Sequence, residues 1–257
     1  MIILYFSVAL IATVIGALAG VGGGIIIKPV LDLIGRDSIG MISILSASTI
    51  FSMSVVSLIH ALVSKRKVNL KLSLLLSTGA IMGGVIGKKT LDWLVEYDEI
   101  KELIGNLQSG ILAFIMLLIL VYFLNKQKIN SMKINKSSIV LLVGLVLGVL
   151  SAFLSIGGGP LNIAILSLLF GMRMEAAVIH SILIIFFSQG ATVITAFFSG
   201  KFAGVDWPIL VTMVIGGLSG GFIGSWLLNR LPENVSERLF SLTIFSLVLL
   251  NVFNLFF

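Results

Sequence analysis

Long apolar segments follow one another along almost the whole chain, and the short connections between them hold most of the charged residues. A helix needs about 20 predominantly apolar residues to cross the hydrocarbon core of a bilayer. Eight segments reach or approach this length: residues 2–20, 41–63, 72–87, 103–124, 138–156, 177–198, 208–228 and 239–257. The third is short, and we expect tilt, local thinning and snorkelling of Lys88 and Lys89 to accommodate it. The pattern predicts an all-α polytopic membrane protein with about eight transmembrane helices.

Composition supports this prediction. The chain has 58% hydrophobic residues, 11% charged residues and no cysteine, whereas soluble domains have roughly 25% charged residues. The lack of cysteine excludes disulfides and thiolate metal sites. The longest connection, residues 88–102, is too short to form an extramembrane domain. Any function is therefore expected inside the bilayer.

The 17 Lys and Arg residues outnumber the 11 Asp and Glu residues. They are spread over the connections rather than gathered on one folded face, so they indicate membrane topology and no nucleic-acid partner. If the connections alternate sides, the even-numbered ones carry slightly more Lys and Arg, and the positive-inside rule favours both termini in the cytoplasm. No Lys or Arg precedes the first apolar segment, so we expect a span there rather than a cleaved signal peptide.

The chain repeats itself with a displacement of about 135 residues. The matching positions include the triple glycine 22–24 on 157–159, Ser46 on Ser181 and, after a slightly longer loop, Gly79, Gly83 and Gly87 on Gly216, Gly220 and Gly224. This predicts a first four-span repeat over residues 1–124, a basic linker over 125–137 and a second four-span repeat over 138–257. An even number of spans in each repeat predicts parallel repeats, related by an axis along the membrane normal.

Each triple glycine is expected to break a helix, because glycine costs about 1 kcal/mol relative to alanine in a helix interior. The apolar runs that follow, residues 25–34 and 161–170, are too short to cross and are predicted to be half-helices. Unpaired N–H groups at such a break must face protein, water or a ligand, and the positive end of a half-helix favours an anion. The candidate substrate-binding glycines are Gly22, Gly23, Gly24, Gly157, Gly158 and Gly159. The alternative is that these glycines only permit tight helix crossing.

Polar residues accompany the glycines. Residues 41–63 and 177–198 are rich in Ser and Thr, which we expect to line a polar path, although hydroxyls can also bond to their own helix. The candidates nearest the breaks are Ser46, Thr49, Ser181 and Gln189, with Asn162 in the second half-helix. Lys28 and His180 are candidates for charge or proton coupling. A snorkelling lysine and a hydrogen-bonded structural histidine are the alternatives.

Other motifs have a structural interpretation. The glycines that recur every four residues at 79–87 and 216–224 predict close helix packing. Gly217-Leu218-Ser219-Gly220 matches the GxSG pattern of rhomboid-type proteases, but those enzymes place their histidine on a later span, and both histidines here precede Ser219. Metal-ligand clusters and phosphate-binding loops are also lacking in the sequence. We therefore expect no enzyme, no cofactor and no metal.

At this point the residues resemble a known family. Gly16-x3-Gly20-x-Gly22-Gly23-Gly24-x4-Pro29, echoed by a second run that ends in Gly157-Gly158-Gly159-Pro160, is similar to the sulfite exporter TauE/SafE family of membrane transporters. The resemblance adds Pro29 and Pro160 to the candidate site residues. It implies movement of sulfite, sulfonates or other small anions across the cytoplasmic membrane of a prokaryote. Lys28, where an apolar residue is usual, and Ala164, opposite Pro29, depart from exact symmetry.

The sequence thus predicts a multi-pass secondary transporter in the cytoplasmic membrane that holds a small anion near the midplane. Alternating access would come from rocking of one half against the other, driven by the proton gradient or another electrochemical gradient. The expected partners are the small anionic substrate and the lipid bilayer. The sequence does not indicate an oligomeric state. The alternatives are an anion channel and a non-transporting membrane scaffold.

Overall fold

The computed structural model describes residues 1–35, 38–64, 69–95, 98–129, 131–132, 134, 136–154 and 158–256. Within these residues the regular structure is entirely helical, so the all-α prediction is confirmed. The α-helices are α1 (Ile2–Ala19), α2 (Gly24–Ile34), α3 (Ile39–Val63), α4 (Leu70–Val95), α5 (Asp98–Leu124), α6 (Ser137–Phe153), α7 (Gly159–Phe170), α8 (Met174–Phe198), α9 (Trp207–Leu228) and α10 (Glu233–Phe256). Two short 3₁₀ segments, η1 (Lys126–Lys128) and η2 (Lys201–Gly204), lie in connections.

Five of the described helices, α1, α3, α4, α8 and α9, contain stretches long and apolar enough to cross a membrane. Large apolar side chains on the outside of the bundle remain exposed, among them Phe114, Phe198 and Phe222, as expected for a surface that meets lipid. The eight predicted spans fall on these five helices and on α5, α6 and α10, and the two predicted half-helices fall on α2 and α7. The number of helices that cross the bilayer stays a prediction.

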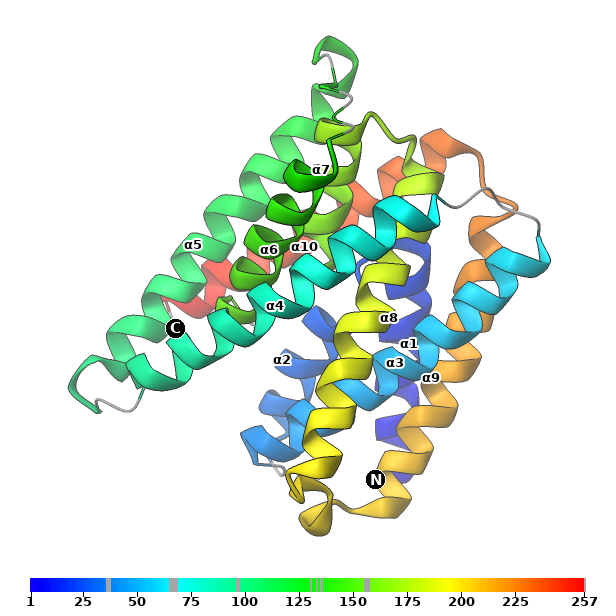
Figure 1. Ribbon diagram of the computed structural model, residues 1–257. Helices are drawn as coiled ribbons and strands as arrows, with labels where there is room; N and C mark the ends of the chain where they lie inside the picture. Colours follow the sequence, from blue (N-terminus) through cyan, green and yellow to red (C-terminus); the bar gives the residue numbers. More distant parts are fainter. Residues whose placement is uncertain are drawn as a thin grey trace.

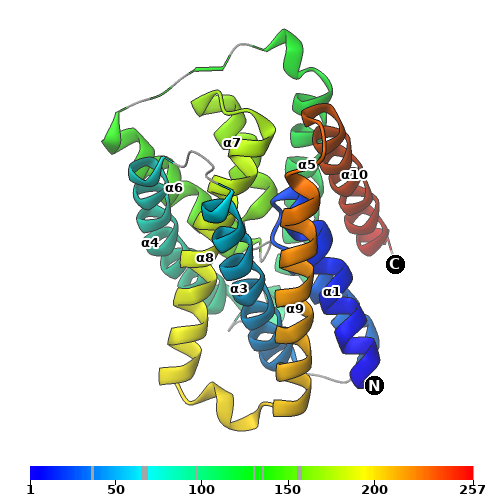
Figure 2. The ribbon, with the colours of Figure 1, turned by 90° about the vertical axis from the view of Figure 1, so that its right-hand side faces the viewer.

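The chain reverses direction after α1 and again after α6. In Figure 1, α1 rises from the N-terminus and α2 turns back toward the end from which α1 came. The α6–α7 pair makes the same reversal from the opposite end, beginning at the linker that follows α5 (Figures 1 and 2). Helices α1 and α6 therefore run in opposite directions, and the expected parallel arrangement is wrong. Each of α1 and α6 forms a hairpin with the half-helix that follows it.

Glycines set the closest helix contacts, as predicted. A Cβ added to Gly83 on α4 would lie 2.8 Å from the carbonyl carbon of Leu145 on α6, and one added to Gly224 on α9 would lie 2.6 Å from the carbonyl oxygen of Val14 on α1. A second glycine face of α9 packs on α3, where a Cβ on Gly221 would lie 2.7 Å from the Met53 carbonyl oxygen. Helices α4 and α6, and α1 and α9, therefore pack backbone against backbone.

Two apolar cores follow from these contacts. One joins α1, α2, α3 and α9 with part of α8. The other joins α4, α5, α6, α7, α8 and α10, and it also includes Ala19 of α1, Ile25 of α2 and Leu228 of α9. Each core therefore contains helices from early and late parts of the chain, and Figure 2 shows α9 between α3 and α1. Side-chain caps fix where helices start: Asn69 accepts from the N–H of Leu72 on α4, and Asp206 accepts from the N–H of Ile209 on α9.

Candidate anion site between two broken helices

The first glycine run ends α1 and starts α2. Gly20 caps α1 with φ of 65°, and Gly22 and Gly23 have φ of 83° and 72°, a backbone region that residues with side chains rarely adopt. The N–H groups of Gly23, Gly24 and Ile25 have no acceptor among the described residues. The start of α2 thus presents free donors and the positive end of its dipole.

The second break has the same form. Gly158, with φ of 83°, precedes α7, and Pro160 occupies the first turn, where no N–H is needed. The N–H groups of Gly159 and Leu161 have no acceptor within the part of the chain that the structure describes. Gly157, the remaining glycine of the predicted site, lies outside the described residues.

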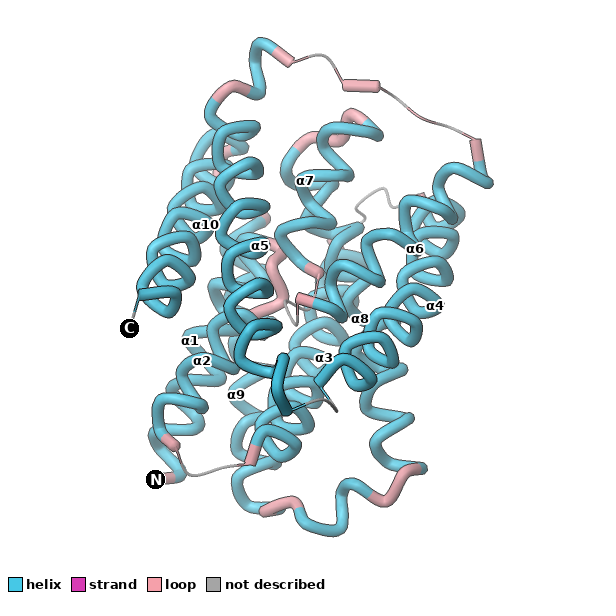
Figure 3. Tube along the Cα trace, turned by 90° about the vertical axis from the view of Figure 1, so that its left-hand side faces the viewer, coloured by secondary structure: helices cyan, strands magenta, loops and turns pink. Residues whose placement is uncertain are grey.

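The two breaks meet in the middle of the molecule (Figure 3). A Cβ added to Gly159 would overlap the backbone of Val21, so the start of α7 touches the loop after α1 directly. The hydroxyl of Ser181 on α8 donates to the carbonyl oxygen of Gly20 at 2.8 Å and lies 3.5 Å from that of Gly159. The structure therefore brings Gly159 and Ser181 against the loop after α1 that carries the first glycine run.

The second break carries most of the polar groups. The Asn162 side chain is 2% exposed, and its amide nitrogen lies 3.4 Å from the point that a Cβ on Gly158 would occupy. The hydroxyl of Ser151, at the end of α6, lies 3.0 Å from the same point. The buried amide of Asn162 and the hydroxyl of Ser151 could both bind a polar ligand at this break.

At the first break, Ser46 takes a comparable position. Its hydroxyl lies 3.6 Å from the point that a Cβ on Gly24 would occupy, and its residue is 4% exposed. The other neighbours are apolar, because Ile50 and Ile185 pack against Gly22. The first break thus offers one hydroxyl and free N–H groups in an apolar setting.

An apolar groove of about 430 Å³ lies beside this first break, between α1, α2 and α10. Ala19 and Ile25 line it next to the glycines, and Leu242 and Leu247 line it from α10. The Thr243 hydroxyl in the groove donates to a carbonyl of its own helix at 2.9 Å. The groove therefore adds no free polar group to the site.

Some predicted site residues lie elsewhere. The Thr49 hydroxyl donates to the carbonyl of Leu45 in its own helix at 2.7 Å, and Thr49 packs against Gly217 of α9. Gln189 is half-buried on α8, about 12 Å along the helix from Ser181 at 1.5 Å per residue. Pro29 lies inside α2. None of these three residues has a described contact with the N–H groups at either break.

The two candidates for coupling have different surroundings. Lys28 is half-buried on α2, one turn beyond Gly24, and it has an interaction partner. His180 is 3% exposed; its Nδ1 contacts the Ser73 hydroxyl, and its Nε2 accepts from the N–H of Asn69 at 3.4 Å. Both ring nitrogens are thus engaged with the start of α4, which agrees with the structural alternative for this histidine.

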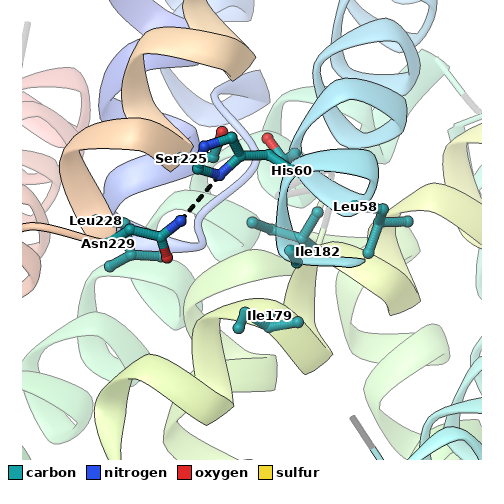
Figure 4. Close-up of a pocket in the computed structure, with 9 residues that line it drawn as sticks. Leu58, His60, Ile179, Ile182, Ser225, Leu228 and Asn229 are labelled. Atoms are coloured by element: carbon teal, nitrogen blue, oxygen red, sulfur yellow. Dashed lines mark hydrogen bonds between the residues drawn. The ribbon is translucent and has the colours of Figure 1, made fainter. Parts of the chain in front are cut away.

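The second histidine also joins two helices. Figure 4 shows a small pocket where the ends of α3 and α9 meet α8, with Asn229 bonded to Nδ1 of His60 at 2.9 Å. Ser57 and Ser225, which also line this pocket, both donate to the carbonyl of Gly221, at 3.3 and 2.6 Å. The polar groups here mainly bond helix to helix.

The protease-like motif has no catalytic setting. The Ser219 hydroxyl donates to the carbonyl of Ile215 in its own helix at 2.8 Å, while His60 and His180 bond to the groups described above. The described residues also contain no group of three His, Cys, Asp or Glu side chains suited to a metal ion.

Sequence reasoning missed two polar residues at the second break. Ser151 aligns with Gly16 in the repeat, so nothing in the pattern marked it. Gln108 on α5 donates from its amide to the carbonyl of Phe153 at 2.6 Å, and so satisfies one of the free carbonyls at the end of α6. Its signal was present in the sequence, since it is an uncharged polar residue within the predicted span 103–124.

Comparisons with known proteins identify the family of the chain. A family model described as sulfite exporter TauE/SafE matches residues 5–251. The chain is 25% identical over 244 residues to the probable membrane transporter protein YunE of Bacillus subtilis (strain 168), covering 84% of both chains. It is also 25% identical over 240 residues to the probable membrane transporter protein YjnA of the same organism, covering 87% of this chain and 90% of YjnA.

Proposed function

Because this chain belongs to the sulfite exporter TauE/SafE family of membrane transporters, we propose that it is a secondary transporter that moves a small anion across the cytoplasmic membrane. One observation carries the proposal. Two helices, α2 and α7, begin side by side in the middle of the molecule, and each start has a buried polar side chain next to its glycines, Ser46 and Asn162 respectively.

An anion fits these two helix starts electrostatically. Each helix places about half a positive charge at its N-terminus, and the free N–H groups at residues 23–25 and at Gly159 and Leu161 are hydrogen-bond donors. The Asn162 amide adds two further donors. The Ser181 hydrogen is already directed at the Gly20 carbonyl, so we assign Ser181 to holding the two hairpins together rather than to donating to the ligand.

The family supports sulfite, an organosulfonate or a related sulfur-containing or organic anion as the substrate. These anions present oxygen acceptors, which backbone N–H groups and a side-chain amide bind without any proton transfer. In this proposal an ion gradient supplies the energy for transport.

Alternating access would use the two opposed hairpins. We propose that residues 1–124 and 138–257 are repeats joined by 125–137, inverted rather than parallel. Glycine packing joins α1 to α9 and α4 to α6, so the bodies that move are not the two halves of the sequence. We propose instead that the bundle of α1, α2, α3 and α9 tilts against the bundle of α4, α6, α7 and α8, with the site between them.

Thermal unfolding of the purified protein in detergent tests the site. Sulfite, sulfate, thiosulfate, taurine, sulfoacetate, acetate and chloride would be compared at matched ionic strength. An anion at about 100 times its dissociation constant adds roughly 2.7 kcal/mol to stability. We expect one class of anion to raise Tm, Asn162→Leu to abolish the rise, and the control Ser219→Ala to retain it. A folded protein that no anion stabilises, or full stabilisation of Asn162→Leu, would contradict the proposed site.

A further inference from the structure

The helix directions divide the connections between two ends of the molecule. The ends of α3, α5, α7 and α9 and the starts of α4, α6, α8 and α10 lie at one end, here called the linker end (Figures 1 and 2). The N-terminus and the α2–α3, α4–α5 and α8–α9 connections lie at the other, here called the terminus end. This division differs from the alternation assumed from eight successive spans, because the α1–α2 and α6–α7 hairpins each return to their own side.

Two tryptophans on α9 mark the depth of the membrane between these ends. Trp207 starts α9 at the terminus end and is 55% exposed, and Trp226 lies near its other end and is 39% exposed. At 1.5 Å per residue the two are about 28 Å apart, close to the roughly 30 Å of a hydrocarbon core. Arg230 stacks over Trp226 with 4.0 Å between its guanidinium carbon and the ring centroid. Tryptophan and arginine in this arrangement are typical of the membrane–water interface.

The basic residues are distributed unequally between the two ends. In the sequence, the stretches that join the helix ends at the linker end, with the first turns next to them, contain eleven of the 17 Lys and Arg residues: four at 64–71, four at 125–136, and Arg173, Arg230 and Arg238. The stretches of sequence that join the helix ends at the terminus end, with the helical turns next to them, contain five: Arg36, Lys88, Lys89, Lys101 and Lys201. Lys28 lies within a hairpin and is assigned to neither end. The excess at the linker end is therefore about twofold.

We propose that the linker end is the cytoplasmic face of the protein and lies against the anionic headgroups of the inner leaflet. Short connections rich in Lys and Arg stay in the cytoplasm, whereas acidic residues affect orientation little. Anionic lipids of that leaflet attract basic residues next to a span. The N-terminus then lies outside, which reverses the orientation expected from the sequence alone.

The orientation also assigns a side to each hairpin. The α6–α7 hairpin, which carries Ser151 and Asn162, enters from the cytoplasm, and the α1–α2 hairpin, which carries the more apolar break, enters from outside. The polar half of the proposed anion site is thus built from the cytoplasmic side.

The chain contains no cysteine, so single cysteines can be labelled without background. Met132 marks the linker end, where its N–H bonds to the Leu168 carbonyl of α7, and it is 68% exposed. Ser199, exposed at the end of α8, marks the terminus end. Intact cells would be treated with a membrane-impermeant maleimide, and the same cells would be treated after permeabilisation. Labelling of Ser199→Cys in intact cells, with at least tenfold less labelling of Met132→Cys until permeabilisation, is the expected result.

A second pair, Lys128→Cys and Lys201→Cys, removes one positive charge from each end and must give the same pattern if either first site reacts poorly. Labelling of the linker-end cysteines in intact cells, with the terminus-end cysteines protected, would overturn the proposal, as would equal labelling of both ends. The result is independent of anion binding, because the inference rests on helix directions, on the tryptophans of α9 and on the basic residues, and not on the anion site.

Discussion

Two adjacent glycines on α4 predict opposite effects of the same substitution. A Cβ on Gly83 would lie 2.8 Å from the carbonyl carbon of Leu145 and 2.9 Å from the nitrogen of Val149, both in the backbone of α6. A Cβ on Gly84 would meet nothing within 4 Å. Because backbone atoms cannot rotate away as a side chain can, α4 and α6 must separate to admit a methyl group at Gly83.

The expected magnitudes follow from two effects. Alanine is favoured over glycine by about 0.8–1.0 kcal/mol in a helix interior, and this gain applies to both positions. Overpacking typically costs about 1–3 kcal/mol, and at Gly83 the cost lies toward the upper end, because the clash involves main chain. We expect Gly84→Ala to stabilise the protein by about 0.5–1 kcal/mol and Gly83→Ala to destabilise it by about 1–2 kcal/mol net.

Thermal unfolding of the two variants and the parent, purified in the same detergent, measures the difference. The predicted order of Tm is Gly84→Ala, then parent, then Gly83→Ala. Shifts of both variants in the same direction would refute the close contact of α4 with α6.

Three further predictions concern single hydrogen bonds. Ser181→Ala leaves the buried carbonyl of Gly20 without its 2.8 Å donor and should cost about 1–3 kcal/mol of stability in thermal unfolding; an unchanged Tm would mean that this bond does not hold the hairpins. Gln108→Leu removes the donor to the Phe153 carbonyl, and we expect it to lower the free energy of unfolding by about 1–3 kcal/mol in the same assay. Gln108→Glu cannot donate this bond when ionised, so it should not restore the lost stability. His180→Leu should lower Tm while the response of flux to an imposed pH gradient persists; a gradient response that vanishes in a folded variant would instead make His180 the coupling group.

The apolar pattern of the sequence predicted most helices because bilayer thickness and helix rise leave little freedom in span length. The triple glycines predicted the breaks for an equally local reason, since glycine disfavours a helix interior. The direction of the chain after each break was not predictable in this way. It depends on the left-handed conformations of Gly20, Gly22 and Gly23, and composition gives no sign of which way such a loop turns. The error in repeat orientation follows from this one feature.

The candidate site shows the same limit. Gly159 and Ser181 come together as predicted because they belong to elements that the repeat already aligned. Thr49 lies on the same predicted span as Ser46, yet its hydroxyl donates to a carbonyl of its own helix. The difference is one of helical face, which the many hydroxyls of residues 41–63 did not define. Ser151 is recognisable only once the end of α6 is placed against Gly158.

Counterflow of a labelled anion tests most directly whether the two glycine breaks form a transport site. Proteoliposomes containing the purified protein would be preloaded with unlabelled sulfite or with the organosulfonate that raises Tm most, and then given a trace of the labelled anion outside. Saturable, transient accumulation above equilibrium, lost in Asn162→Leu and kept in Ser219→Ala, is the predicted result. Flux that rises linearly with concentration and shows no counterflow would indicate a channel, and no flux from folded protein would contradict transport altogether.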